Sequence, residues 1–110
     1  TLVLENLCAI TLYKKYDSGI YYFNRNIEVD FYVPEEGLAV QACYRMSDET
    51  TLEREIKALV ALNSLYPLKK AMIVTYEDEG VMERDGLKIE IVPVWKWVLN
   101  GVTKASQKTT

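Results

Sequence analysis

The chain has 110 residues, 49% of them hydrophobic and 26% charged, with a formal net charge of −3. This composition suits one globular domain with a single core, and the acidic balance argues against a broad surface for nucleic-acid phosphates. The sequence has no histidine, which excludes Ser–His and Cys–His nucleophiles and imidazole metal ligands.

The sequence carries no apolar run long enough for a membrane span and no signal-peptide pattern, so we expect no membrane partner. Cys8 and Cys43 lack metal-type spacing and are expected to be reduced thiols of a cytoplasmic protein. The first predicted helix begins at residue 2 without an N-cap, which suggests a piece of a longer protein. We expect one domain over residues 1–102 and a polar, disordered tail over residues 103–110.

The first half of the chain predicts a helix followed by three strands. Apolar residues at spacings of three and four predict a helix over Leu2–Tyr16. A short aromatic strand, Ile20–Asn24, precedes an alternating strand, Ile27–Val33. Pro34–Gly37 is typical of a hairpin turn, and it leads into a third strand, Leu38–Tyr44.

The second half predicts a helix, a buried strand, a hairpin and a short terminal helix. The long helix keeps its apolar stripe up to Pro67, and Glu53 is expected to form an exposed ion pair with Lys57. Its candidate N-caps are Ser47, Asp48 and Thr50, the last in a capping box with Glu53. The later elements are Ala71–Tyr76, the hairpin Val81–Glu83 with Leu87–Val92, and the helix Val94–Leu99. This order predicts an α/β (α+β) fold in which a mixed β-sheet is flanked by helices.

Asp30 is the most unusual residue of the second predicted strand. Strict alternation places it on one face with Glu28 and Tyr32. The other face would consist of the apolar residues Ile27, Val29, Phe31 and Val33. A carboxylate in such a strand needs a partner, because burying it alone is costly. The alternatives are a metal ion, backbone amides of a strand or turn, Arg25 and Arg45.

Glu5 lies on the apolar face of the first predicted helix, one turn from Leu2 and Cys8, so we expect it to point toward the sheet. There it would meet Asp30 together with the polar row of the third strand, Gln41 and Cys43. Glu5 would then act either as a metal ligand or as a hydrogen-bond partner between helix and sheet. Cys43 would be either a nucleophile or, without a histidine to activate it, a small buried hydrophobe.

The order helix, three strands, helix, strand, with Glu5 and Asp30 at these places, resembles the PD-(D/E)XK nuclease-like fold, which is restriction-endonuclease-like. This resemblance implies how active members work. Carboxylates from the first helix, the second strand and the third strand hold Mg²⁺, and a lysine two positions after the third-strand acid positions or activates water. Here the third-strand positions are Gln41-Ala42-Cys43, which supply neither the acid nor the lysine. The resemblance therefore implies a degenerate site with vestigial positions Glu5, Asp30, Gln41 and Cys43.

Residues 2–99 also resemble the C-terminal domain of unknown function of bacterial and archaeal AAA-type ATPases. The resemblance rests on the motifs LEN from Leu4, EVDF from Glu28 and PVWKW from Pro93. It implies an ATPase portion upstream, and the chain itself contains no Gly-rich loop that ends in Gly-Lys-Ser/Thr.

We therefore expect a non-catalytic accessory domain without cofactor or metal; any metal would be held by Glu5 and Asp30. Its partners would be the upstream ATPase portion, other subunits or a protein client. Trp95 and Trp97 point to different sides of a helix, so one should pack on the sheet and the other serve an interface. The alternative function is a Mg²⁺-dependent DNA endonuclease that uses Glu5, Asp30 and Glu28. Nucleic-acid binding without cleavage is a third hypothesis, which the acidic balance disfavours.

Overall fold

The computed structural model describes residues 2–24 and 26–100, so the tail predicted at residues 103–110 lies outside the described residues. The elements are α1 (Leu2–Tyr16), β1 (Tyr21–Asn24), β2 (Glu28–Val33), the 3₁₀ helix η1 (Pro34–Glu36), β3 (Leu38–Ala42), α2 (Glu49–Leu65), β4 (Lys70–Thr75), β5 (Gly80–Arg84) and β6 (Leu87–Pro93). A short helix over residues 94–100 follows β6. Every predicted helix and strand is present, with ends that differ by one or two residues at most.

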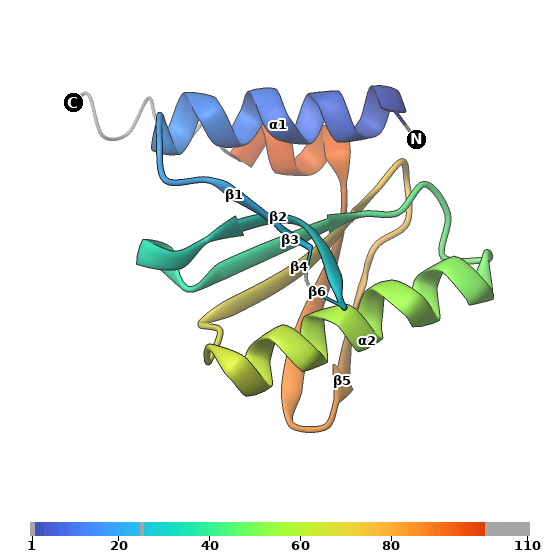
Figure 1. Cartoon of the computed structure of the whole chain (residues 1–110). Coiled ribbons are helices and arrows are strands. Elements are labelled where there is room, and N and C mark those ends of the chain that lie inside the picture. Colours follow the sequence, from blue (N-terminus) through green and yellow to red (C-terminus); the bar gives the residue numbers. More distant parts are fainter. Residues whose placement is uncertain (1, 25, 101–110) are drawn as a thin grey trace.

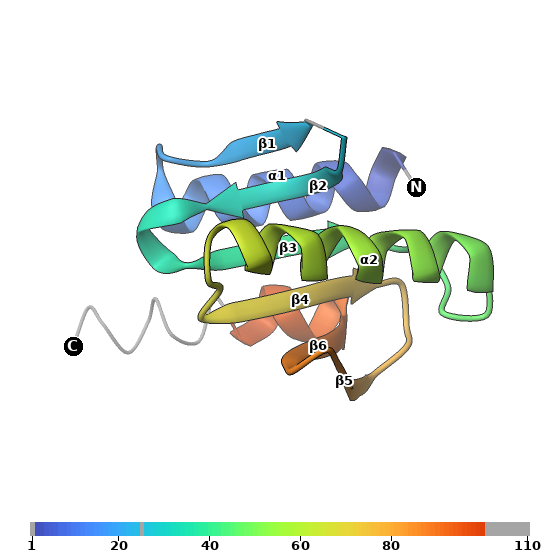
Figure 2. The ribbon, with the colours of Figure 1, turned by 60° about the horizontal axis from the view of Figure 1, so that its bottom comes forward.

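The strands form one six-stranded mixed sheet in the order β1-β2-β3-β4-β6-β5. The strands β1, β2 and β3 are antiparallel neighbours, β3, β4 and β6 run parallel, and β5 pairs with β6 as an antiparallel hairpin. Figure 2 shows α2 in front of the sheet and running along β3 and β4, the parallel neighbours that it connects. Parallel neighbours need such a crossover. The predicted α/β fold with a mixed sheet flanked by helices is confirmed.

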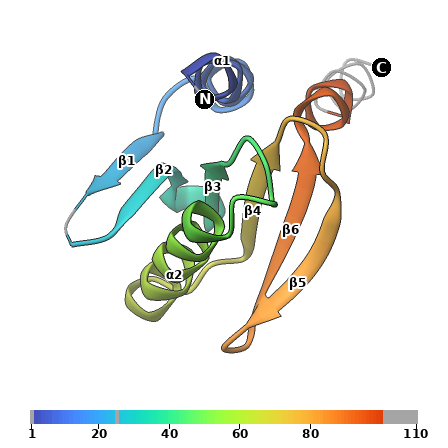
Figure 3. The same cartoon turned by 90° about the vertical axis from the view of Figure 1, so that its right-hand side faces the viewer.

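Helices cover both faces of this sheet. Figures 1 and 3 show α1 and the helix of residues 94–100 on one face and α2 on the other. Each face has its own apolar core. The α1-side core is built around Cys8 and Leu12, and the α2-side core around Leu59 and Leu62. The sheet is therefore the middle layer of three, and both its faces are covered.

The C-terminal tryptophans and the cysteines take the expected environments. Trp97 packs against the α1-side core and Trp95 is exposed, as predicted. Cys8 and Cys43 are both free thiols, and both are buried. Among the described residues, no helix combines the length and apolar character that crossing a membrane requires.

The strand β2 does not keep the strict alternation that its sequence predicts. Val29 lies in the α2-side core, whereas Phe31 and Val33 contact the α1-side core. The pairing of β2 with β1 shifts register between Val29 and Tyr32, and such a bulge turns the following side chains to the opposite face. Asp30 lies within this irregular stretch. The prediction of one shared apolar face is therefore wrong for the set Ile27, Val29, Phe31 and Val33.

Two contacts of α2 test the sequence predictions: one identifies its N-cap, and the other changes the partner of Glu53. Among the three candidate N-caps the structure uses Asp48, whose carboxylate accepts the Thr51 N–H, so the capping-box alternative is wrong. Glu53 pairs with Arg84 of β5 at 2.7 and 3.2 Å rather than with Lys57. The partner is 31 positions away in the sequence, which local spacing on the helix cannot indicate. This pair ties the outer part of α2 to the β5–β6 hairpin.

Gly37 fixes how β3 begins beside β4. Its φ is +59°, a left-handed conformation that favours glycine, and its carbonyl accepts the N–H groups of Lys69 and Lys70. A Cβ on Gly37 would lie 3.0 Å from the Lys69 Cγ and 3.1 Å from the Lys69 nitrogen. The turn therefore requires a residue without a side chain, and it sets the pairing of Leu38 with Lys70 from which the parallel ladder continues.

Candidate functional site

The predicted polar positions meet at an open cleft between α1, the start of β2 and α2. We call it the acidic cleft. Its lining includes Glu5 of α1, Glu28 and Asp30 of β2, Gln41 of β3 and Glu55 of α2. The structure thus brings Glu5, Asp30 and Gln41 together from three different elements.

Gln41 bridges β2 and β3 at the point where their regular pairing ends. The backbone pairing of the two strands runs as far as Phe31. Beyond it, the buried Gln41 side chain accepts the Asp30 N–H through Oε1 at 2.8 Å and donates through Nε2 to the Glu28 carbonyl at 2.9 Å. A longer contact of 3.4 Å joins Nε2 to the Glu55 carbonyl on α2. The side-chain amide therefore satisfies backbone groups of β2 that the β3 backbone does not reach.

Asp30 makes the reciprocal bond. Its Oδ2 accepts the Ala42 N–H at 2.8 Å, so each strand uses a side chain to bond the backbone of the other. We call Asp30 and Gln41 the strand clamp. Among the partners predicted for Asp30, a strand amide is therefore confirmed. Arg25 lies outside the described residues, and Arg45 lies instead over the ring of Tyr44, 5.4 Å from its centroid.

Asp30 is the titratable residue of the strand clamp. Burial raises the pKa of Asp30 above its ordinary value, and the bond from the Ala42 N–H opposes this. The carboxylates of Glu5 and Glu28 raise the pKa further, whereas the Arg54 guanidinium lowers it. Repulsion among the acids of the cleft thus works against the ionised form of Asp30, and one hydrogen bond and one cation support it.

Glu55 is a member of this site that the sequence predictions missed. Its Oε2 atom is buried and has no hydrogen-bond partner among the described residues. Burial raises the pKa of Glu55 to about 8, with Asp30 adding to the effect and Arg54 opposing it. Glu55 therefore keeps its proton at neutral pH. A signal was available, because Glu55 follows Leu52 by three positions and precedes Leu59 by four, which places it on the inward stripe of α2.

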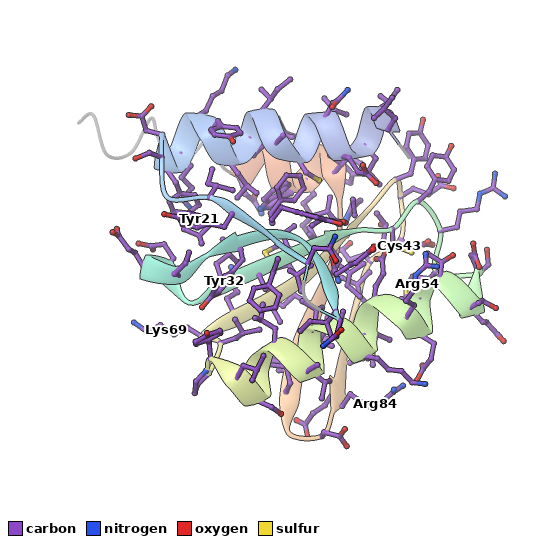
Figure 4. The ribbon with its side chains drawn as sticks, viewed as in Figure 1. Tyr21, Tyr32, Cys43, Arg54, Lys69 and Arg84 are labelled. Carbon is purple, nitrogen blue, oxygen red and sulfur yellow. The ribbon has the colours of Figure 1, made fainter. Side chains whose placement is uncertain are left out.

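Cys43 does not join the acidic cleft. It follows β3 (Figure 4) and lies in the α2-side core. Its Sγ is 3.3 Å from the Arg45 carbonyl oxygen. Burial raises the pKa of Cys43 to about 11, with Glu55 adding to the effect, so the thiol stays protonated at neutral pH. This is the environment of a small buried hydrophobe and not of an activated nucleophile.

The charges of the cleft are arranged differently from those of the nuclease pattern. Its cations, Arg54, Lys57 and Arg84, come from α2 and β5, and β3 supplies none. Over the part of the chain that the structure describes, no three acid or thiol side chains are placed to hold one metal ion. The cleft therefore contains carboxyl groups that repel one another when ionised. Burial raises the pKa of two of them, Asp30 and Glu55.

Comparisons with known proteins give one informative match. No family model matches the chain, and no solved structure matches it significantly. An uncharacterized protein of Methanocaldococcus jannaschii is 39% identical to the chain over 111 residues. The match covers 88% of this chain and 24% of that protein, so the chain spans about a quarter of the relative's length. A related sequence thus exists within a much longer polypeptide.

Proposed function

We propose that the chain is a non-catalytic accessory domain, nuclease-like in fold, at the C-terminus of an AAA-type ATPase of the cytoplasm. It works by binding protein: the upstream ATPase portion, another subunit or a protein client. It uses no cofactor, and the vestigial nuclease-like positions serve the fold.

The observation that carries this proposal is the strand clamp. In the nuclease pattern, the second-strand Asp and the third-strand acid are free to hold Mg²⁺. Here Gln41 occupies the position of the third-strand acid, and both ends of its amide bond the β2 backbone. The Asp30 carboxylate in turn bonds the Ala42 N–H. Because the side chains of Asp30 and Gln41 are already engaged in hydrogen bonds to the backbone, these bonds favour a structural role of the two residues over a catalytic one.

The length of the relative supports the accessory role. The aligned region makes up 24% of the Methanocaldococcus jannaschii protein, as expected of one domain within a larger protein. The exposed Trp95 supports the binding role, since large aromatic residues are enriched at protein interfaces.

Metal-dependent cleavage of supercoiled plasmid tests the proposal. We expect the chain to nick no plasmid in the presence of Mg²⁺ or Mn²⁺ beyond the rate seen with EDTA, because the clamp residues are engaged and no β3 lysine is present. Asp30→Asn is the matched variant, since an amide oxygen can still accept the Ala42 N–H while the charge is removed. Wild type and variant should behave alike.

The alternative function is a Mg²⁺-dependent DNA endonuclease that uses Glu5, Asp30 and Glu28. The gathering of these carboxylates in one cleft favours it. Cleavage that requires a divalent cation and disappears in Asp30→Asn would establish this alternative and end the non-catalytic proposal. A salt-sensitive plasmid shift without cleavage would instead indicate nucleic-acid binding.

A further inference from the structure

The helix α1 is apolar on both of its sides. Its inner stripe, which includes Leu4, Cys8 and Leu12, fills the α1-side core. Its outer stripe includes Val3 and Ile10, whose exposed fractions are 73% and 53%. The outer side of α1 also carries the exposed Asn6, Lys14 and Lys15, so it is mainly apolar and polar toward its C-terminal end. A helix with apolar residues on two sides is normally covered on both. The outer stripe of α1 therefore has the composition of a covered surface.

The helix α2 provides a comparison within the same chain. Its outward positions include Arg54, Lys57 and Ser64, all of them exposed, and its inward positions are apolar except for Glu55. This amphipathic pattern is the one expected of a helix that faces solvent. Among the described residues, the outer side of α2 is thus mainly polar, with Leu65 as an exposed exception near its end, whereas the outer side of α1 is mainly apolar.

The helix of residues 94–100 extends this apolar layer. It packs on the same core as α1 and lies on the same face of the sheet (Figure 3). Trp95 and Leu99 lie one turn apart, with exposed fractions of 58% and 57%. Exposed large apolar side chains thus lie on both helices of this layer, and clusters of such side chains are typical of interaction surfaces. We define this α1 outer surface by Val3, Leu7, Ile10, Tyr13, Trp95 and Leu99.

We propose that the α1 outer surface is the docking face for the upstream ATPase portion of the same polypeptide. The inference rests on the proposed function, which supplies this partner. The relative supports an occupant from the same polypeptide, because 88% of the chain aligns with only 24% of that protein and most of the relative's length lies outside the match. Lys14 and Lys15 in the last turn of α1 favour an acidic border on the docked surface. The partner surface is therefore apolar at its centre and acidic at one edge.

Thiol labelling of an Ile10→Cys variant tests the docking face. The variant is compared as the chain alone and as the full-length polypeptide, and the native Cys8 and Cys43 do not compete because both are buried. We expect rapid labelling in the chain alone and labelling at least about tenfold slower in the full-length protein, because the covered site reacts only when it opens. Ser64→Cys on the exposed side of α2 is the matched control and should react equally in both.

Each outcome decides the inference. Equal labelling of Ile10→Cys in both proteins would overturn it. Protection in the chain alone that grows with concentration would also overturn it, because a second copy would then cover the face. ATP hydrolysis by the full-length protein is measured separately. If the protein hydrolyses ATP while Ile10→Cys reacts freely, the docking face fails and the proposed function stands. If Ile10→Cys is protected in a protein without ATPase activity, the proposed function and the named occupant both fail.

Discussion

Gln41→Met is expected to lower the free energy of unfolding by about 2–4 kcal/mol, although the new side chain is similar in size. The variant leaves the Asp30 N–H and the Glu28 carbonyl without the partner that holds them in the native fold. Each buried polar group left unpaired costs about 1–3 kcal/mol. Gln41→Ala also opens a cavity and should cost about 1–2 kcal/mol more. Denaturation in urea, followed by tryptophan fluorescence, measures both variants.

Thr75→Val is the matched control for this prediction. Thr75 is as buried as Gln41, and its hydroxyl makes one bond, to the Asp78 carbonyl at 2.7 Å. Thr75→Val leaves one carbonyl unpaired where Gln41→Met leaves two backbone groups unpaired, so it should cost about half as much, about 1–2 kcal/mol. If Gln41→Met cost no more than Thr75→Val, Gln41 would not act as a clamp between β2 and β3.

Glu55→Gln is expected to stabilise the protein at alkaline pH and to change its stability little near pH 4.5. Burial, and then Asp30, raises the pKa of Glu55 from 4.5 to about 8, so the folded state holds a proton that the unfolded chain releases. The contribution of this carboxyl to stability is therefore complete below pH 4.5 and is lost as the pH rises through about 8. Glutamine resembles the protonated carboxyl at every pH. Relative to Glu55→Gln, the free energy of unfolding of the wild-type protein should therefore fall by about 3–4 kcal/mol between pH 4.5 and about 8.

Urea denaturation at several pH values measures this difference. Glu77→Gln, which changes an exposed carboxylate in the loop after β4, is the control and should keep the wild-type pH dependence. If Glu55→Gln and wild type lost stability in parallel from acid to alkaline pH, the proton on Glu55 would not be linked to folding.

The regular elements could be predicted from the sequence because their signals are local. The spacing of Leu4, Cys8 and Leu12 defines α1, and the alternation of Leu87, Ile89 and Ile91 defines β6, whose apolar residues are indeed buried. The face of Phe31 could not be predicted in this way. A bulge in β2 depends on its pairing with β1, and the period-two pattern alone fits an unbroken strand equally well.

The candidate site was predictable in its positions and not in its bonding. The predicted facing of the helix and strands and their order placed Glu5, Asp30 and Gln41 near one another, but they also placed Cys43 there, which lies in the α2-side core instead. The reciprocal bonds of Asp30 and Gln41 depend on how β2 and β3 separate, which no local pattern records. The raised pKa of Glu55 likewise depends on burial between α2 and the sheet, so it appears only in the assembled fold.

The central claim is that Asp30 and Gln41 hold β2 to β3 and do not serve a metal ion. Thermal unfolding of the chain in Mg²⁺ and in EDTA tests it most directly, because a cation that binds only the folded state stabilises it by about 2.7 kcal/mol at a hundredfold excess over Kd. We predict the same Tm in both conditions, for wild type and for Asp30→Asn. A Tm that rises with Mg²⁺ in wild type and not in Asp30→Asn would contradict the claim and make Asp30 a metal ligand.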